Sequence, residues 1–442
     1  MARTLSAHAA RLPGGRWIRG GYWDHEIWPS QALPTRDQID AATPAHPVFV
    51  ERLDGHMALA NSLALQLAGI SDTTESPAGG TIVRDDHGRP TGLLKDNAMA
   101  LVTRAIPPDE SGDVLAKARA ALKHAASLGV TTIQDMTASA AELTAYQVLY
   151  ERGELTARIY AIQNCDIAGL IAAGVRTGFG DDWLRIGGRK LFADGSMGSG
   201  TAAFYETYTD DPSTCGLLIH TSEMLEELVF AADEAGFQPI VHAIGDRANT
   251  LVLDVFEKLE AVRGKRDRRV RIEHAQVVRR EDLARFKALG VIASIQPSHS
   301  IDDMRWAARR IGERRCALAY NVRSFVDAGV HVAFGTDWFV EPLNPMLGLY
   351  AAVTRQFPDG TPERGWYPEE RVSIEQAVAC YTIGSAYAER AEDRKGTLAP
   401  GKLADLVVLS KDIFAIPPQA ILETRPLQTL VGGRVVYEAW TN

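Results

Sequence analysis

The chain has 442 residues, of which 46% are hydrophobic and 23% charged, a balance that is ordinary for a folded globular protein and excludes a disordered one. Its net charge of −9 disfavours a nucleic-acid partner, because such partners usually require a basic face. No uninterrupted apolar stretch is long enough to span a membrane, and the start shows no signal-peptide core, so we expect a cytoplasmic protein without a membrane partner. The four cysteines form no Cys-x-x-Cys pair, which suits that reducing compartment.

The first part of the chain differs in pattern from the rest. Residues 1–45 are predicted to lead into a barrel, and residues 46–112 are predicted to form a small β-rich insertion. Turn signals such as Asp-His-Gly and Arg-Pro-Thr-Gly separate short apolar runs in this insertion.

Between residues 113 and 395, short apolar segments rich in β-branched residues alternate with amphipathic helical patterns. Such segments, joined by helices, predict a parallel sheet with both faces buried. Seven of them indicate an α/β fold in which a distorted TIM-type (β/α)8 barrel lacks its first strand. The predicted strands are 129–136, 157–164, 184–194, 237–246, 269–276, 291–299 and 331–339. Residues 396–442 carry Pro-Gly and Gly-Gly turns between short apolar runs and predict a remnant of a β-sandwich.

Four residues that can bind a metal fall near the carboxyl ends of these predicted strands: Lys190, His242, His274 and Asp337. Reactive groups of α/β barrels gather at these ends. Two imidazoles and a carboxylate suit zinc or a similar divalent ion. Each residue alone is more often structural, as an ion-paired lysine, a buried histidine or a helix cap. The four in this order predict a metal site.

Nine stretches spread over nearly the whole chain resemble the amidohydrolase superfamily. Within it, they are most similar to the YtcJ-like, or amidohydrolase 3, group, which includes N-substituted formamide deformylases. The stretches are WIRGGYWD (17–24), LDGHMALANSLAL (53–65), PAGGTIVRDDHGRPTGLL (77–94), KLFADGSMGSGTA (190–202), VHAIGDRA (241–248), IEHAQ (272–276), QPSH (296–299), GTDWFVEPLNP (335–345) and GTLAPGKLADLVVL (396–409).

The resemblance implies a metal-dependent hydrolase of carbon–nitrogen bonds other than peptide bonds, in an amide, formamide or cyclic amide, acting through a metal-activated hydroxide. Lys190 would be carbamylated and bridge two ions, and His242 and His274 would bind the second ion. Asp337 would bind the first ion and transfer a proton.

The family also carries a His-x-His pair on the first barrel strand, and none of the 11 histidines here lies two residues from another. The chain begins where the family has already passed that pair, so we expect an N-terminally truncated member. It would hold one divalent ion, which its ligands indicate to be zinc, or two ions where a longer native N-terminus supplies the pair. The alternative is a catalytically impaired barrel with a binding or structural role.

Four further residues are candidates for substrate contacts: His56, Asn61, His299 and Trp338. The alternatives are turn and helix-cap roles for His56 and Asn61, a buried structural role for His299, and packing for Trp338. The segment GSMGSG (195–200) lacks the ending of a P-loop and the spacing of a dinucleotide fingerprint, which disfavours a nucleotide. The expected partner is a small-molecule substrate, and a homodimer stays open.

Overall fold

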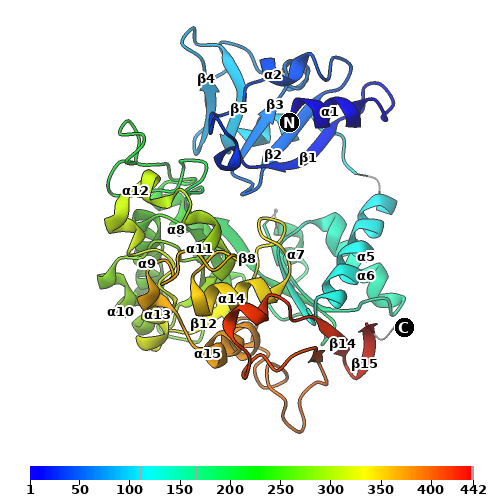
Figure 1. Cartoon of the computed structure of the whole chain (residues 1–442), viewed down its shortest axis with the longest axis vertical. Coiled ribbons are helices and arrows are strands. Elements are labelled where there is room, and N and C mark those ends of the chain that lie inside the picture. The colour runs from blue at the N-terminus through cyan, green and yellow to red at the C-terminus, as the bar shows by residue number, and fades with distance from the viewer. Residues whose placement is uncertain (110, 165–166, 440–442) are drawn as a thin grey trace. The chain divides into compact units, whose positions relative to one another are not determined.

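The computed structural model describes residues 1–109, 111–164 and 167–439, and the chain forms two compact units (Figure 1). Unit 1 comprises Met1–Pro108, Ala193–Thr221 and Arg309–Ile311. Unit 2 comprises Asp109–Phe192, Ser222–Ala308 and Gly312–Asn442. Two short segments of unit 1 therefore interrupt the sequence of unit 2.

Unit 1 is built on a five-stranded sheet with the order β1-β2-β3-β5-β4. Only the β1–β2 pair is parallel; the others are antiparallel. The strands are β1 (Ile18–Trp23), β2 (Val48–Arg52), β3 (Met57–Ala60), β4 (Gly80–Arg84) and β5 (Pro90–Asp96). The helices of this unit are α1 (Ala2–Ala9), η1 (His25–Ile27), α2 (Asp37–Asp40), α3 (Ser62–Leu67) and α4 (Met99–Thr103).

The sheet of unit 1 carries a buried apolar cluster on each face. Successive strand residues point to opposite sides, so neighbours along a strand join different clusters. Val48 and Val50 belong to one apolar cluster, and Phe49 between them belongs to another. The predicted β-rich character of residues 46–112 agrees with this sheet. Residues 1–45, expected to lead into the barrel, instead supply strand β1 to the same sheet, where Ile18 pairs with Val48.

Unit 2 confirms the predicted α/β fold. It contains a curled sheet of seven parallel strands in the order β12-β11-β10-β9-β8-β7-β6. The strands are β6 (Thr132–Ala138), β7 (Arg158–Gln163), β8 (Leu184–Phe192), β9 (Pro239–Ala243), β10 (Arg271–His274), β11 (Ile292–Ile295) and β12 (Val332–Phe334). The largest differences at the carboxyl ends of the predicted strands are at β11 and β12, which end earlier than expected. Pro297 begins a helix directly after β11, and β12 stops at Phe334.

Helices connect these strands and extend beyond the last of them. They are α5 (Ser111–Ser127), α6 (Ala140–Glu151), α7 (Ala168–Ala172), α8 (Ser222–Glu234), α9 (Asp246–Arg263), α10 (Arg280–Leu289), α11 (Pro297–Asp303), α13 (Val322–Asp327), α14 (Pro345–Thr354), η2 (Pro368–Glu370), α15 (Ile374–Ala379), the π-helix η3 (Cys380–Gly384), α16 (Ser385–Ala388) and η4 (Pro418–Ile421). Helix α12 (Ala307–Cys316) contains residues of both units. Among the residues described, no helix is long and apolar enough to cross a membrane.

The two edge strands of the seven-stranded sheet, β6 and β12, are not paired to each other but share a hydrogen-bonding partner. Gln134 of β6 donates from Nε2 to the carbonyl oxygen of Ser385 at 2.8 Å. The hydroxyl of Ser385 donates to the carbonyl oxygen of Phe334, the last residue of β12, at 2.9 Å. The first residue of α16 therefore links both edges of the sheet.

The C-terminal segment forms a three-stranded antiparallel sheet of β13 (Leu406–Leu409), β14 (Pro426–Val431) and β15 (Arg434–Glu438). Several hydrogen bonds fasten it to the rest of unit 2, among them those of Thr429, Asp405 and Arg434. Thr429 Oγ1 donates to the carbonyl oxygen of Ala126 in α5 at 2.8 Å, and Arg158 of β7 forms a bidentate pair with Asp405 at 2.6 and 2.8 Å. This sheet agrees with the predicted sandwich remnant.

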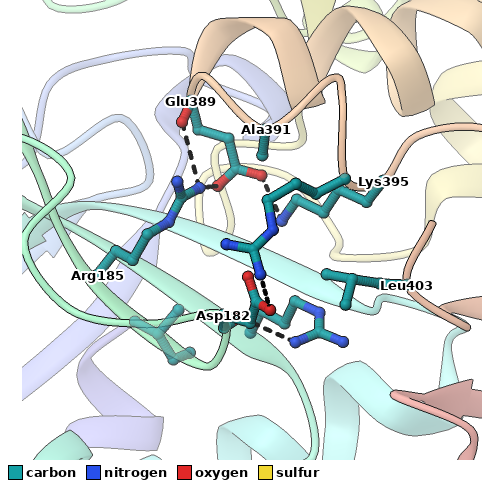
Figure 2. Close-up of a pocket in the computed structure, with 9 residues that line it drawn as sticks. Asp182, Arg185, Glu389, Ala391, Lys395 and Leu403 are labelled. Atoms are coloured by element: carbon teal, nitrogen blue, oxygen red, sulfur yellow. Dashed lines mark hydrogen bonds and ion pairs between the residues drawn. The ribbon is translucent and has the colours of Figure 1, made fainter. Parts of the chain in front are cut away.

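A small pocket near the amino ends of β7 and β8 is closed by ion pairs (Figure 2). Arg185 and Lys395 both reach the carboxylate of Glu389, and Arg394 reaches Asp182. The strands run parallel, so this pocket lies at the opposite end of the sheet from the predicted metal ligands. Its charged groups are bound to one another, which indicates a structural role.

Candidate metal centre

The carboxyl end of the unit 2 sheet brings the four predicted ligands together. Lys190 lies near the end of β8, His242 near the end of β9, and His274 is the last residue of β10. The rings of His242 and His274 meet edge to face, with centroids 4.6 Å apart. Asp337 follows the last residue of β12 by three positions. Neighbouring parallel strands therefore place these side chains at one edge, as the sequence predicted.

His274, His299 and Asp337 each offer one ligand atom to a candidate metal site. These atoms all lie within 4.8 Å of one another. Both imidazoles are buried, and their rings stack with centroids 5.9 Å apart. His299 lies in the first turn of α11 rather than at a strand end. The sequence indicated His299 only as a substrate contact, whereas the structure places it among the candidate ligands.

A buried amide orients the imidazole of His274. Its Nδ1 atom lies 2.8 Å from Oε1 of Gln296, the residue that precedes α11. An amide oxygen accepts but cannot donate, so Nδ1 carries the proton and Nε2 keeps its lone pair. Histidines that bind metals are commonly held in this way. Two imidazoles and a carboxylate, one imidazole fixed by a second residue, fit a divalent ion such as zinc.

The backbone is unusual at the residues that end β10 and follow β12. His274, Ala275 and Asp337 have φ values of 72°, 42° and 54°, in the left-handed region. Residues other than glycine rarely adopt this conformation, and such strain clusters at functional sites. Two of these strained residues, His274 and Asp337, belong to the group of three candidate ligands, which supports a functional role for this edge of the sheet.

Burial of the Lys190 side chain disfavours its positive charge. The side chain is buried, and Nζ lies 5.0 Å from the centroid of the Phe192 ring. Burial lowers the pKa of Lys190, although the carboxylates of Glu273 and Asp337 oppose this shift. The lower pKa increases the fraction of uncharged amine, which is the nucleophilic form.

A buried ion pair lies on β10, next to the ligands. Arg271 forms an ion pair with Glu273, with 2.8 Å between Nη2 and Oε1, and donates hydrogen bonds to Gln134 Oε1 at 2.7 Å and to Ser294 Oγ at 3.2 Å. The sequence analysis did not single out this pair. The spacing in RIEH (271–274) could have indicated this ion pair, because residues two apart on a strand share a face.

Glu341 is a second carboxylate that the sequence analysis missed. It follows Asp337 by four residues, and only 8% of its surface is exposed. Burial, together with the nearby charges of Asp303 and Asp337, raises the pKa of Glu341 to about 8. Its position in GTDWFVEPLNP (335–345), just beyond the predicted Asp337, was the available signal.

The remaining predicted substrate contacts lie outside this group of candidate ligands. Trp338 is 45% exposed, with its ring 5.6 Å from that of His124. Asn61 lies in unit 1, is buried, and caps α3 by accepting from Ala64 N at 2.9 Å. Its amide also bonds Val48 N, Thr43 Oγ1 and His46 O. These contacts favour the helix-cap alternative for Asn61.

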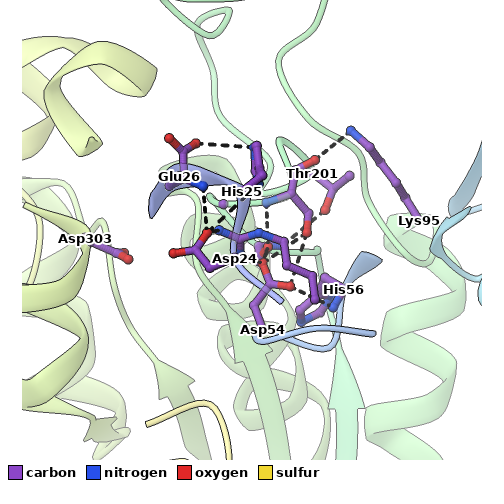
Figure 3. A network of polar contacts seen from close by, with 12 residues as sticks. Asp24, His25, Glu26, Asp54, His56, Lys95, Thr201 and Asp303 are labelled. Carbon is purple, nitrogen blue, oxygen red and sulfur yellow. Dashed lines mark hydrogen bonds and ion pairs between the residues drawn. The ribbon is translucent and has the colours of Figure 1, made fainter. Parts of the chain in front are cut away.

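His56 also belongs to unit 1, where Nδ1 lies 2.7 Å from the carboxylate of Asp96 (Figure 3). A carboxylate partner favours the protonated imidazole and fixes its orientation.

Comparison with known proteins gives a match over almost the whole chain. The family Amidohydro_3, described as "Amidohydrolase family", matches residues 1–437. Protein LONG AFTER FAR-RED 3 of Arabidopsis thaliana is 39% identical over 96% of this chain and 74% of its own length. The putative amidohydrolase YtcJ of Bacillus subtilis (strain 168) is 33% identical over 97% of this chain and 81% of its own.

Two further matches bear on chemistry. The N-substituted formamide deformylase of Arthrobacter pascens is 27% identical over 98% of this chain and 81% of its own length. Among solved structures, an uncharacterized metal-dependent hydrolase from Pyrococcus horikoshii superposes with a TM-score of 0.76 at 30% identity. That superposition covers 94% of this chain and 81% of the other.

Proposed function

Because the chain belongs to the amidohydrolase family and is a metal-dependent hydrolase, we propose that it cleaves carbon–nitrogen bonds other than peptide bonds. The substrate class is a small amide, formamide or cyclic amide. One relative that matches nearly the whole chain is named for the removal of a formyl group from nitrogen, which supports this class. The observation that carries the proposal is the approach of His274, His299 and Asp337 within 4.8 Å at the carboxyl end of the sheet.

The metal would be held by His274, His299 and Asp337, with His242 and Lys190 beside them. Zinc is the ion we propose, since imidazole and carboxylate donors suit it. When bound, a divalent ion supplies polarisation of a carbonyl group and a lower pKa for water. Gln296 keeps Nε2 of His274 available because its Oε1 accepts a hydrogen bond from Nδ1–H.

Asp337 is the residue we assign to proton transfer. Hydrolysis of an amide requires a base that accepts a proton from water and an acid that returns it to the leaving nitrogen. A carboxylate can serve as both in turn, and Asp337 is at least partly exposed, so solvent and substrate can reach it.

Lys190 would contribute a further oxygen ligand after reaction with carbon dioxide. The uncharged amine attacks the carbon of carbon dioxide and releases one proton. The new N–C bond gives a carbamate with a negative charge on oxygen. The lowered pKa of Lys190 supports this role, because the protonated amine has no lone pair for the attack.

The metal site is tested by zinc analysis of the purified protein after chelation and reloading. We expect stoichiometric zinc in the wild type and large losses in His274→Ala, His299→Ala and Asp337→Asn. His8→Ala, which changes an exposed histidine, is the matched control and should retain the metal. A folded wild type that takes up no divalent ion would overturn the site and leave the binding or structural alternative.

The bond class needs a separate assay. The zinc-loaded protein is offered N-benzylformamide, a cyclic amide and a phenyl ester of similar size. Release of benzylamine from the formamide or opening of the cyclic amide to an amino acid, abolished in Asp337→Asn, supports the proposal. Hydrolysis of the ester alone would refute carbon–nitrogen cleavage while leaving a metal-dependent hydrolase in place.

A further inference from the structure

Within unit 1, the loop of residues 195–201 is fastened by side chains from the β2–β3 hairpin and from β5 (Figure 3). Asp54, in the hairpin turn, accepts hydrogen bonds from Ser196 Oγ at 2.5 Å and from Ser199 Oγ at 3.0 Å. Lys95 of β5 donates from Nζ to the carbonyl oxygen of Ser199 at 2.7 Å. The loop is therefore held by polar contacts with the β2–β3 hairpin turn and with strand β5.

His56 contacts two acidic side chains, those of Asp54 and Asp96. Its backbone N–H donates to Asp54 Oδ1 at 3.2 Å, and its ring Nδ1 lies 2.7 Å from Asp96 Oδ1. The same oxygen of Asp96 lies only 2.7 Å from where a Cβ on Gly195 would be. The backbone at the start of the loop is thus packed directly against the carboxylate that His56 binds.

Asp96 has few other sources of stabilisation. Its side chain is fully buried, and its Oδ2 atom accepts no hydrogen bond from any residue that the structure describes. A buried, ionised carboxylate with one oxygen lacking a hydrogen bond is stabilised mainly by a nearby positive charge. A protonated His56 supplies that charge directly at Oδ1.

The charges around His56 favour its protonated form. Burial opposes protonation, but the hydrogen bond to Asp96 and three nearby carboxylates outweigh it and raise the pKa of His56. The carboxylates are those of Asp54, Asp96 and Asp194. The cations beside them are already engaged, Arg52 with Asp54 at 2.5 Å and Lys95 with the loop carbonyl. A neutral His56 would leave this group with an excess of negative charge.

We propose that His56 is a pH-dependent lock on the loop 195–201, which holds the loop against the hairpin as an imidazolium and releases it on losing its proton. The direction follows from the sign of the shift. A histidine with a raised pKa stabilises the folded arrangement at low pH, and that stabilisation is lost as pH rises through the raised value. The unperturbed reference is about 6.5, so the release falls above that pH.

The test is hydrogen–deuterium exchange of the peptide that covers the loop, corrected for the intrinsic pH dependence of exchange, from about pH 6 to about pH 9. We expect protection in the wild type to fall about tenfold or more across this range, because the loss of the proton removes the stabilisation that the protonated form gives. His56→Gln should show low protection at every pH. His87→Gln, which changes an exposed histidine in the β4–β5 turn, should behave as the wild type.

A second measurement keeps the proposal falsifiable if His56→Gln fails to fold. The imidazole of His56 is titrated by NMR in the wild type and in Asp96→Asn. We expect its midpoint above about 6.5 in the wild type and lower in the variant. A neutral His56 at pH 6, or a loop whose protection is unchanged while His56 titrates, would overturn the proposal. Neither readout depends on metal or on hydrolysis, so the proposed function can fail without affecting this result.

Discussion

The imidazole of His274 and the amide of Gln296 are joined by a buried contact of 2.8 Å between Nδ1 and Oε1. The two residues are 22 positions apart and lie on consecutive strand–helix units. This contact leaves Nε2 of His274 as the nitrogen with a free lone pair, which is the atom we propose as a metal ligand. Residue 296 is not itself a proposed ligand, but under this proposal its identity affects metal binding.

Replacing Gln296 with leucine removes this acceptor and frees the ring of His274 to rotate. We expect zinc affinity to fall about 10- to 100-fold, the usual effect of losing such a partner. Competition with a chelator of known affinity measures the change. Gln147→Leu alters an exposed glutamine on α6 and should leave the affinity unchanged. An unaltered affinity in Gln296→Leu would contradict the proposed orientation of His274.

Carbamylation of Lys190 is expected to depend on bicarbonate and on pH. Protein exchanged into ¹³C-bicarbonate should show one carbamate carbon signal by NMR. The signal should weaken as pH falls, because protonation of the amine blocks its attack on carbon dioxide. Lys190→Arg should lack the signal, whereas Lys123→Arg, at an exposed lysine of α5, should keep it. A signal that persists in Lys190→Arg would assign the modification to another lysine.

The buried pair of Arg271 and Glu273 should be sensitive to loss of one partner. Arg271→Met leaves the carboxylate of Glu273 buried without its cation, which typically costs about 3–5 kcal/mol. Urea denaturation of the metal-free protein measures this loss. Arg323→Met breaks the exposed pair with Asp327 and should cost less than about 1 kcal/mol. If the two variants were equally stable, the pair on β10 would not be held as the structure shows.

Glu341 makes the metal-free protein less stable at high pH. Its pKa is raised to about 8, so it stays protonated in the folded chain over a range where an unfolded chain would ionise it. The free energy of unfolding should therefore fall as pH rises above about 4.5, and the loss should be complete above about 8. Glu341→Gln should be more stable than the wild type at pH 9 by a few kcal/mol, since each pKa unit corresponds to about 1.4 kcal/mol.

The control for this prediction is Glu363→Gln, which alters an exposed carboxylate. Thermal melting of all three proteins at pH 5 and pH 9 makes the comparison. Equal stability of wild type and Glu341→Gln at pH 9 would show that Glu341 is ionised without cost in the folded protein.

Asn61 should behave as a structural residue. Asn61→Ala removes the cap of α3 and three further buried hydrogen bonds, so we expect a loss of about 2–4 kcal/mol in the free energy of unfolding. Ser139→Ala removes only the cap of α6 and should cost about 1 kcal/mol. The KM of Asn61→Ala should match that of the wild type. A raised KM without a loss of stability would restore the substrate-contact alternative.

Much of the fold could be predicted from local patterns. Short β-branched segments alternating with amphipathic helices predict a parallel sheet, and all seven predicted strands are present in unit 2. Their ends were less certain. Residues 296–299 follow the apolar run of β11 and were predicted to continue it, but Pro297 suits the first turn of a helix and β11 stops at Ile295.

By itself, the sequence determined the family, the alternation of strands and helices, and the placement of Lys190, His242, His274 and Asp337 near strand ends. These features depend on neighbours along the chain or on the parallel arrangement that such neighbours impose. Only the tertiary structure brought His299 to His274, paired Arg271 with Gln134, and set Asp96 against His56, a residue 40 positions away. Contacts of this kind arise from the packing of distant segments, which leaves no periodic trace in the sequence. For that reason the candidate ligands could be predicted from the sequence, whereas their contacts with residues distant in the chain are seen only in the folded structure.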